Sequence, residues 1–327
     1  MPDTRASSPL HLNQRAADIV DEMVRQQARL RVAVDTIEGG GHVLDAGVTS
    51  RGGLEAGVGL ARLCLAGLGA IDWVPGDIPH PSCPRIQVRT DHPVAACMAS
   101  QYAGWKISVG GFFAMGSGPM RAAYGGEGLF EDIGHREVAE VAVGVLEASK
   151  LPGREVFDYI AEKTGVEPSA ITLAVAPTRS LAGSIQVVAR SVETALHKLH
   201  TMGFDLSRVE AGLGSAPLPP PAKNDLAALG RTNDAVLYGA RVTLWVRGDD
   251  ESLAQLGPRL PSSASPDYGA PFAEIFERYG HDFYKVDPAL FSPAEITFSN
   301  LDTGRTLRFG QLEARVLEQS FFGEKRS

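Results

Sequence analysis

Cysteine is scarce in this sequence, and its spacing argues against the two commonest structural uses of the residue. Only Cys64, Cys83 and Cys97 occur in 327 residues, and they form no C-x-x-C pair or Cys/His ligand pattern. Neither a structural zinc site nor a disulfide framework is therefore expected. Three unpaired thiols fit a reducing compartment, so we predict a cytoplasmic protein.

Long apolar runs and basic clusters are also lacking. The most apolar window, residues 54–71, is interrupted by Glu55 and Arg62 and repeats at helical spacing, so it predicts a core helix and no membrane span. The first twelve residues contain Asp3 and no apolar core of the kind that signal peptides have. Acidic residues outnumber basic ones by 39 to 31, giving a net charge of −8. This balance, without a basic stripe, argues against a nucleic-acid partner.

Phosphate-binding motifs are missing as well. The three glycines at 39–41 join two predicted strands, and we interpret them as a hairpin turn. FFAMGSGPMR (residues 112–121) matches neither G-x-G-x-x-G nor G-x-x-x-x-G-K-[ST]. Its small residues either let a backbone approach a ligand closely or form a tight turn before a helix opened by Pro119. Nucleotide binding therefore has no motif support.

What the sequence does contain is an ordinary globular composition and an alternation of strand and helix patterns. Hydrophobic residues make up 44% and charged residues 21% of the chain, which is enough for one large core or two smaller ones. Strands are predicted at residues 32–37, 42–46, 71–74, 86–90, 138–146, 171–176, 241–246 and 295–298. Helices are predicted at residues 13–30 (capped by Asn13), 54–68, 94–105, 153–164, 183–200 and 226–238, then before residue 295 and from about residue 311. This alternation alone suggests an α/β fold without internal repeats.

The segment from 179 to 200 has the strongest chemical character in the chain. One side of its predicted helix is an apolar stripe of Val188, Val192, Ala195, Leu196 and Leu199. The opposite side carries Arg190, Glu193, His197 and His200. Arg190 and Glu193 are three residues apart, so their side chains can meet on a helix. They form either an exposed ion pair worth about 0.2–0.5 kcal/mol or part of a ligand-binding site. The second alternative is considered because a strand and a turn precede the helix, where α/β-type sheets tend to bind ligands.

Three polar positions near predicted helix starts have both a structural and a functional interpretation. Asp91 lies where a strand meets the helix opened by Pro93, so it either caps that helix or binds a ligand, and capping is the commoner role. Thr232 can cap a helix in the same way. Arg51 precedes the helix predicted at residue 54 and is placed to meet an anion there, although loop arginines are more often solvated.

Six segments have unusual compositions and stand in a characteristic order. They are GGLEAG (52–57), TDHPVAACMASQYAGW (90–105), FFAMGSGPMRA (112–122), LEASKLP (146–152), VAPTRSLAGSIQVVARSVETALHKLH (175–200) and GRTNDAVLYGARV (230–242). In this order the chain resembles the methenyltetrahydromethanopterin cyclohydrolases over essentially its whole length. The first dozen residues and the stretch after about Asp249 resemble that family less closely.

The resemblance implies an enzyme of one-carbon metabolism that reversibly opens the ring of 5,10-methenyltetrahydromethanopterin by hydrolysis, giving the 5-formyl form. It implies an α+β fold of two domains with mixed sheets, a substrate cleft between them, and a homotrimer. We place the domains at residues 1–148 and 149–327, allow them to exchange segments, and assign the catalytic helix to the second. The pterin is the expected partner; no nucleic acid, membrane, metal ion or separate cofactor is expected.

The catalytic glutamate of the family, with an arginine three residues before it, falls on Glu193 and Arg190. Glu193 would accept a proton from the water that attacks the methenyl carbon, which is electrophilic because it belongs to an amidinium cation. Arg190 would hold that carboxylate and favour its ionised form, whereas burial would oppose ionisation. Contacts with the substrate are expected, on placement alone, from Asp91, Ser117, Thr178, Arg179, Asn233 and Asp234. Cations for its anionic tail are expected among Arg51, Arg121, Arg179 and Lys198.

Two other functions stay open at this point. A pterin-binding protein without catalysis would keep the cleft, but the presence of both Arg190 and Glu193 argues against it. A cyclohydrolase acting on the tetrahydrofolate analogue would differ in the length and charge of the substrate tail, which the sequence does not distinguish.

Overall fold

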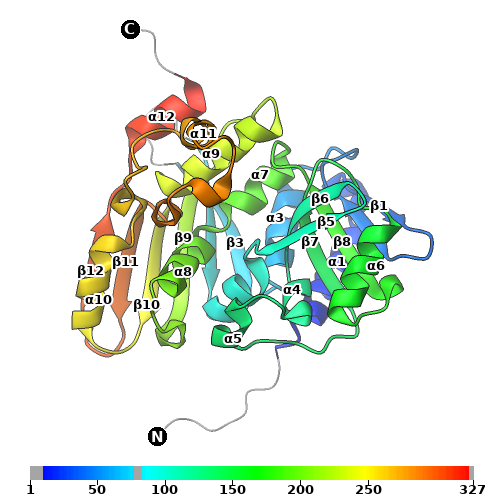
Figure 1. Cartoon of the computed structure of the whole chain (residues 1–327), viewed down its shortest axis with the longest axis horizontal. Helices are drawn as coiled ribbons and strands as arrows, with labels where there is room; N and C mark the ends of the chain where they lie inside the picture. The colour runs from blue at the N-terminus through cyan, green and yellow to red at the C-terminus, as the bar shows by residue number, and fades with distance from the viewer. Residues whose placement is uncertain (1–9, 77–82, 324–327) are drawn as a thin grey trace, which may run out of the picture.

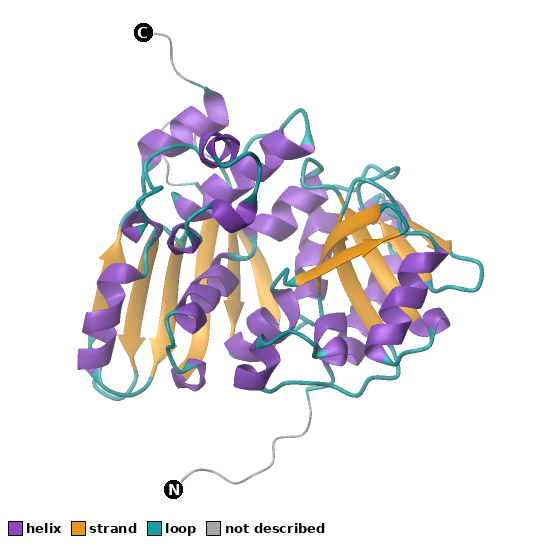
Figure 2. Cartoon of the chain, viewed as in Figure 1, coloured by secondary structure: helices purple, strands orange, loops and turns teal. Residues whose placement is uncertain are grey.

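The computed structural model describes residues 10–76 and 83–323 and shows an α+β protein with two mixed β-sheets of six strands each (Figures 1 and 2). The sheets lie side by side along the long axis, and helices α3 (Leu54–Cys64) and α7 (Leu181–Val188) lie between them (Figure 1). The predicted α+β class with mixed sheets is confirmed. The α/β fold that the alternation alone suggested is wrong, because most neighbouring strands run antiparallel.

The first sheet turns its two faces toward different helices. Its strands, in sheet order, are β1 (Ala33–Thr36), β2 (His42–Asp45), β8 (Ile171–Ala176), β7 (Ala142–Glu147), β6 (Phe112–Ser117) and β5 (Trp105–Val109). In β7, Val143 and Val145 pack in the core shared with α1 (Leu12–Arg25) and α3, whereas Ala142 and Leu146 pack in the core beneath α6 (Arg154–Thr164). Because side chains alternate along a strand, Glu147 lies on the side of Val143 and Val145, the side that faces the second sheet.

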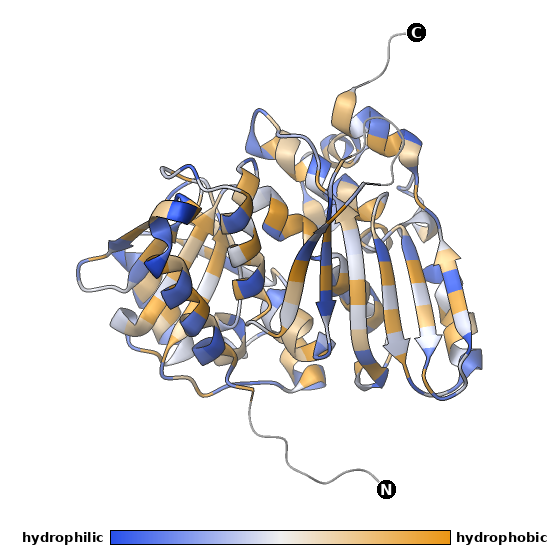
Figure 3. Ribbon diagram, turned by 180° about the vertical axis from the view of Figure 1, so that it is seen from behind, coloured by the Kyte–Doolittle hydropathy of each residue, from blue (hydrophilic) through white to orange (hydrophobic). Residues whose placement is uncertain are grey.

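The second sheet is covered by helix α8 (Ser191–Thr201) on one face. Its strands, in sheet order, are β12 (Thr306–Gly310), β11 (Glu295–Asn300), β10 (Arg241–Val246), β9 (Val209–Pro217), β4 (Arg85–Thr90) and β3 (Gly69–Val74). Val192 and Leu196 of α8 pack in one core with Leu244 and Phe298 of the sheet. Seen from behind, the opposite face is not crossed by any described helix, and it mixes polar and apolar side chains (Figure 3).

The remaining helices complete the two layers. The α-helices are α1 (Leu12–Arg25), α2 (Gln27–Leu30), α4 (Met120–Tyr124), α5 (Leu129–Ile133), α6 (Arg154–Thr164), α9 (Asp225–Leu237), α10 (Asp250–Leu256), α11 (Phe272–Arg278) and α12 (Ala314–Phe322). Short 3₁₀ turns are η2 (Pro168–Ala170), η3 (Leu206–Arg208), η4 (Gly257–Arg259), η5 (Ser262–Ala264), η6 (Phe283–Lys285) and η7 (Pro288–Leu290). None of the helices in the described ranges has the length and apolar character needed to cross a membrane.

The two sheets exchange strands across the predicted domain boundary. Strands β3 and β4 precede residue 148 yet belong to the second sheet, and β8 follows that residue yet lies inside the first. The division into 1–148 and 149–327, with exchange of segments allowed, remains a prediction.

One of the segments that carry the resemblance, GGLEAG, has a packing role. A Cβ atom at Gly57 would lie 2.7 Å from Cβ of Ile185 and 3.0 Å from Cα of Ala182. Real Cβ atoms do not approach so closely, so glycine lets α3 and α7 meet backbone to backbone. This contact fixes α7, the helix that leads into Arg190, against α3, which itself packs on β7 of the first sheet.

Two local predictions were wrong. Asn13 does not cap a helix: α1 begins at Leu12, and the buried Asn13 amide donates to the Pro119 carbonyl at 2.9 Å while its Oδ1 accepts the Val143 N–H at 3.0 Å. The helix predicted at 94–105 is an eight-residue π-helix, η1 (Val94–Gln101), after which Trp105 begins β5. Both departures depend on partners far away in the sequence.

Candidate active site

The segment predicted as one helix at 183–200 is two helices that meet at Arg190. Helix α7 begins at Leu181, because the Oγ of Ser180 accepts the N–H of Gly183 at 3.0 Å and so caps the helix. It ends at Val188, and α8 begins at Ser191. The predicted start at Gly183 and the predicted continuity are therefore wrong. Arg190 occupies the bend, at the N-cap position of α8.

Glycines in β9 determine how deeply α8 lies on the second sheet. A Cβ atom at Gly212 would lie 2.7 Å from Cγ1 of Val192, and one at Gly214 would lie 2.4 Å from the Oγ of Ser191. Side chains at these positions would push the helix away from the sheet. The glycines therefore fix the position of the first turn of α8, which carries Glu193.

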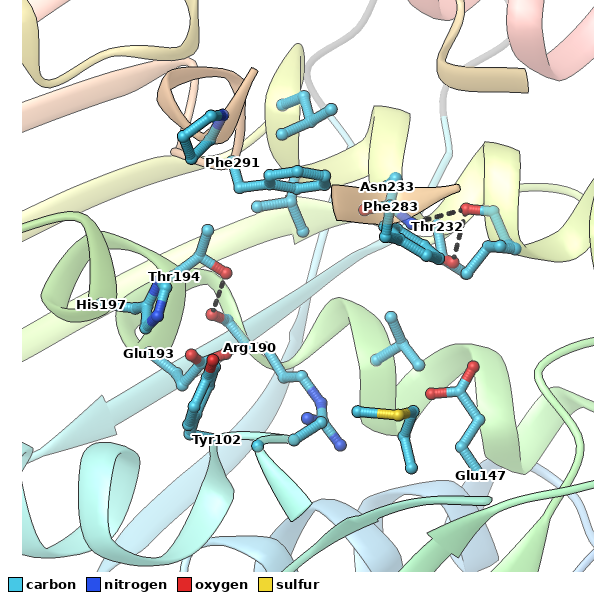
Figure 4. A pocket seen from close by; sticks show the side chains of 18 of the residues that line it. Tyr102, Glu147, Arg190, Glu193, Thr194, His197, Thr232, Asn233, Phe283 and Phe291 are labelled. Atoms are coloured by element: carbon cyan, nitrogen blue, oxygen red, sulfur yellow. Dashed lines mark hydrogen bonds between the residues drawn. The ribbon is translucent and has the colours of Figure 1, made fainter. Parts of the chain in front are cut away.

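A cavity of about 650 Å³ lies between α8 and the edge of the first sheet that β5 and β6 form. This volume is in the range of sites that bind small organic molecules. Its apolar wall includes Phe113, Met115, Val187, Phe283, Tyr284 and Phe291. Its polar side chains include Lys106, Glu147, Arg190, Glu193, His197 and Asn233, several of which Figure 4 shows. The cavity is thus mostly hydrophobic, with a few ionisable groups that can orient a ligand.

Glu193 is a buried carboxyl group without a hydrogen-bond donor among the described residues. The residue is 6% exposed and lines the cavity. Burial raises the pKa of Glu193 to about 7, although the positive charges of Arg190 and Arg121 oppose the shift. The sequence left open whether burial or Arg190 prevails, and in the structure burial prevails. A carboxyl group with this pKa can both accept and return a proton near neutral pH.

Arg190 is held in place by the protein and does not form the expected contact with Glu193. One terminal nitrogen donates to the carbonyl of Gln101 at 3.0 Å, and the other donates to Gln186 Oε1 at 2.7 Å and to Ser117 Oγ at 3.2 Å. Among the described ion pairs, which extend to 4.0 Å, Arg190 and Glu193 do not occur together. The Nε–H of Arg190 is buried and has no partner within the described residues. The two side chains therefore share the cavity without neutralising each other.

A stacked pair of neutral rings lies beside the carboxyl group of Glu193. Tyr102 and His197 stack with their centroids 4.6 Å apart and their planes 21° apart. Burial lowers the pKa of His197 to about 4, with the charges of His200, Arg121 and Lys198 adding to the shift. Burial also raises the pKa of Tyr102 to about 12. Both rings are thus uncharged at neutral pH, and Glu193 is the group nearby that titrates there.

The other predicted contact residues divide into two sets. Asn233 lines the cavity, Ser117 lies behind it and holds Arg190, and the hydroxyl of Thr178 donates to Glu147 in its wall. The remaining three, Arg179, Asp91 and Asp234, lie elsewhere. Arg179 is half exposed and pairs with Asp225 at 2.9 Å, and Asp91 borders a separate cavity of about 200 Å³.

Two interpretations of polar residues as helix caps are wrong. The side chain of Asp91 does not cap η1, which has Pro93 at its N-cap position. Thr232 is fully buried inside α9 and donates to the carbonyl of Ala228 at 2.9 Å; the cap of that helix is Asn224. Asp234, one turn from the end of α9, is also fully buried, and it accepts hydrogen bonds from Phe272 N–H at 2.8 Å and Ser320 Oγ at 2.6 Å.

The cations expected for a substrate tail do not line the cavity. Arg121 is fully buried and pairs with Glu127 at 2.7 Å, and Lys198 donates to the carbonyl of Ala289 at 3.1 Å. Arg51 is exposed on its loop, away from the cavity wall. Besides Arg190, Lys106 of β5 lines the cavity, with its amine 6.0 Å from the centre of the Phe113 ring.

Sequence reasoning missed several wall residues. Glu147 belongs to LEASKLP, but its strand was predicted to end one residue earlier, and no local pattern marked it. Phe283, Tyr284 and Phe291 come from a part of the chain that resembles the family less closely. The cluster of aromatic residues at 272–291 was the signal that would have indicated this wall, although aromatic clusters are more often core. In the described ranges no group of three His, Cys, Asp or Glu side chains is arranged to hold a metal ion.

Comparison with known proteins identifies the family. The sequence profile of the family described as "Cyclohydrolase (MCH)" matches residues 11–321. A methenyltetrahydromethanopterin cyclohydrolase of Rhodopirellula baltica is 52% identical over 287 residues, which cover 86% of each chain. Those of Methylobacillus flagellatus and Methanococcoides burtonii are 46% and 41% identical and cover 95% of this chain. The chain therefore belongs to the methenyltetrahydromethanopterin cyclohydrolase family.

Proposed function

We propose that this protein catalyses the hydrolytic ring opening of 5,10-methenyltetrahydromethanopterin to the 5-formyl form. The observation that carries the proposal is Glu193, a buried carboxyl group with a pKa of about 7 and no hydrogen-bond donor among the described residues, in a cavity large enough for a pterin. The names of the relatives, all methenyltetrahydromethanopterin cyclohydrolases, support the choice of substrate.

In the proposed mechanism Glu193 is the general base. The methenyl carbon belongs to an amidinium cation, so water can add to it once a proton is removed, and a carboxylate in reach contributes typically about 10²–10⁴-fold. The neutral carbinolamine then collapses: the C–N10 bond breaks, N10 takes the proton back from Glu193, and the hydroxyl proton leaves to solvent. Water and the cationic substrate thus give the formyl product and one proton. The reverse sequence closes the ring.

Arg190 acts on this chemistry through its charge and its fixed position. Its positive charge lowers the pKa of Glu193 against the effect of burial, so part of the carboxyl group is ionised at neutral pH. Its three hydrogen bonds to the protein hold the guanidinium in one place. A fixed cation also destabilises the bound cationic substrate more than the neutral carbinolamine. The guanidinium therefore favours the addition of water.

The reaction needs no metal ion or redox cofactor in this proposal, because the substrate supplies its own electrophilic carbon. Dialysis against a strong chelator should leave turnover unchanged. Activity that is lost to the chelator and restored by one particular divalent ion would contradict this part of the proposal.

The direct test is to follow the loss of methenyl absorbance with purified protein. We expect turnover with the tetrahydromethanopterin substrate and much slower turnover with the tetrahydrofolate analogue. Faster turnover of the folate analogue would indicate the alternative substrate, and tight binding of either pterin without turnover would indicate a binding protein.

We also propose a homotrimer, which rests on the family resemblance alone. Light scattering in dilute buffer should give about three times the chain mass of 34.7 kDa. A monodisperse monomer would contradict it.

A further inference from the structure

A second carboxylate lines the cavity and has no part in the proposed proton transfer. Glu147 is the last residue of β7, is partly buried, and lies on the side of the strand that faces the second sheet. Figure 4 shows it on one side of Arg190, with Glu193 on the other. The cavity therefore presents two carboxyl groups at separate places along its wall.

The carboxyl group of Glu147 is held in one orientation and keeps capacity to accept hydrogen bonds. The hydroxyl of Thr178 donates to its Oε1, and Thr178 is itself fixed because its carbonyl accepts the Ser184 hydroxyl at 2.8 Å. No other described residue donates to the Glu147 carboxylate, so Oε2 and the second lone pair of Oε1 are available. A carboxylate accepts up to about four hydrogen bonds, and an orientation fixed beforehand lowers the cost of ordering on binding.

The surroundings of Glu147 suit a flat ring. Met115 is its direct partner across the β6–β7 ladder, and both Met115 and Val187 line the cavity beside it. Arg190 forms no ion pair with Glu147 among the described residues, and its terminal nitrogens donate to Gln101, Ser117 and Gln186 instead. A fixed carboxylate next to an apolar surface recognises a planar ligand that offers two parallel N–H donors at its edge.

We propose that Glu147 binds the aminopyrimidinone edge of the pterin, accepting one hydrogen bond from the ring N3–H and one from the 2-amino group. This assignment deepens the proposed function and rests on it. The edge lies at the end of the bicyclic ring opposite the methenyl carbon, so a pterin held by Glu147 at one end has its reactive carbon at the other. Glu147 is thus a substrate-binding residue, and Thr178 positions it.

The assignment is tested by binding, without turnover. The probes are 6-methyltetrahydropterin and its 2-oxo counterpart, in which an acceptor replaces the 2-amino donor, titrated by calorimetry or ligand-observed NMR. Wild type should bind the amino compound about tenfold to a hundredfold more tightly, the value of one charge-assisted hydrogen bond. Glu147→Gln should abolish or invert this preference, because its amide can donate to the 2-oxo group.

Two further variants make the test specific. Thr178→Val removes the donor that fixes Glu147 and should reduce the preference a few-fold. Glu155→Gln, which removes an exposed carboxylate on α6, should leave it unchanged. Circular dichroism checks that each variant folds, and the wild-type comparison stands even if Glu147→Gln does not fold.

The possible results separate this assignment from the proposed reaction. Equal binding of the two probes by wild type, or a folded Glu147→Gln protein that keeps the wild-type preference, would overturn the assignment while leaving hydrolysis intact. A clear preference that Glu147→Gln abolishes, in a protein that does not turn over the methenyl pterin, would support the subsite and contradict the reaction.

Discussion

Two buried carboxyl groups on successive α-helices have nearly the same pKa and different surroundings. Burial raises the pKa of Glu193 on α8 to about 7, and it raises the pKa of Asp234 on α9 to about 7 as well. Asp234 is fully buried and accepts hydrogen bonds from Phe272 and Ser320, so it joins α9 to α11 and α12. Glu193 has no such donor within the described residues and faces the cavity.

The comparison shows that a raised pKa does not by itself identify a catalytic residue. Buried polar groups are normally satisfied by hydrogen bonds, as Asp234 is. An unsatisfied buried carboxyl group is costly, and it is retained where a ligand or a reaction uses it. We therefore assign structure to Asp234 and chemistry to Glu193, and the following predictions test that distinction.

The largest effect after replacement of Glu193 itself is expected for its cationic neighbour. In Arg190→Lys a single ammonium replaces a planar group that reaches Gln101, Gln186 and Ser117 at once, so we expect kcat to fall at least about tenfold. Since the two residues act together, the double variant Arg190→Lys/Glu193→Gln should cost far less than the product of the single effects. Steady-state kinetics of the four proteins measure this, and independent, multiplying effects would contradict it.

Asp234→Ala should change stability and leave the chemistry alone. It leaves the Phe272 N–H and the Ser320 hydroxyl without their acceptor, so the free energy of unfolding should fall by about 1–3 kcal/mol or more. Turnover per folded molecule should stay near that of wild type. Urea unfolding and active-site titration measure the two quantities. Loss of turnover at full folding would place Asp234 in the site after all.

The two carboxyl groups should also differ in how their removal changes stability with pH. The pKa of each carboxyl group is raised in the folded state. The contribution of each group to the free energy of unfolding is therefore greatest below about pH 4 and is lost as the pH rises through about 7. Glu193→Gln should therefore raise the free energy of unfolding at pH 8, by at most about 3 kcal/mol, because a buried charge is removed. Asp234→Ala should lower it at pH 5, where its hydrogen bonds are lost. Thermal unfolding across pH 5–8 tests both signs; a destabilised Glu193→Gln at pH 8 would contradict the assignment.

The smallest effect concerns charges at the edge of the cavity. Lys106 is exposed and lines the cavity, whereas Arg179 is engaged by Asp225 outside it. If the anionic substrate tail meets Lys106, Lys106→Ala should raise KM by about twofold to fivefold, the value of an exposed ion pair, and should weaken its salt dependence. Arg179→Ala should change KM less. A larger rise in KM for Arg179→Ala than for Lys106→Ala would instead support the tail contact that the sequence predicted at Arg179.

Local sequence patterns predicted most helices and strands and the polar face of α8. They did not predict the tertiary contacts that place this face in a cavity. The strand at 241–246 was predicted correctly because its periodicity is local. The depth of α8 on the second sheet depends on Gly212 and Gly214, which meet Val192 and Ser191 only once the sheet has formed. The α+β class itself came from the family resemblance, since the antiparallel pairing of β4 with β9 joins segments more than a hundred residues apart.

The candidate site was predictable to a similar degree. The helical pattern singled out Arg190 and Glu193, and the resemblance gave them catalytic roles. The absence of an ion pair between them did not follow from their i, i+3 spacing. Glu147 was missed because its role depends on the cavity that α8 and residues 281–291 form across from it. The pKa of Glu193 also depends on burial, which spacing alone does not determine.

The most direct test of the account is the rate of Glu193→Gln with the methenyl pterin bound. Glutamine keeps the size of the side chain but cannot accept the proton from water. We predict that kcat falls by at least about 10², the lower limit for loss of a general base, with the fold and pterin binding retained. In wild type, kcat should rise with pH through about 7 as Glu193 ionises, and the variant should lose this dependence. A folded Glu193→Gln protein that turns over like wild type would contradict the assignment of Glu193 as the general base.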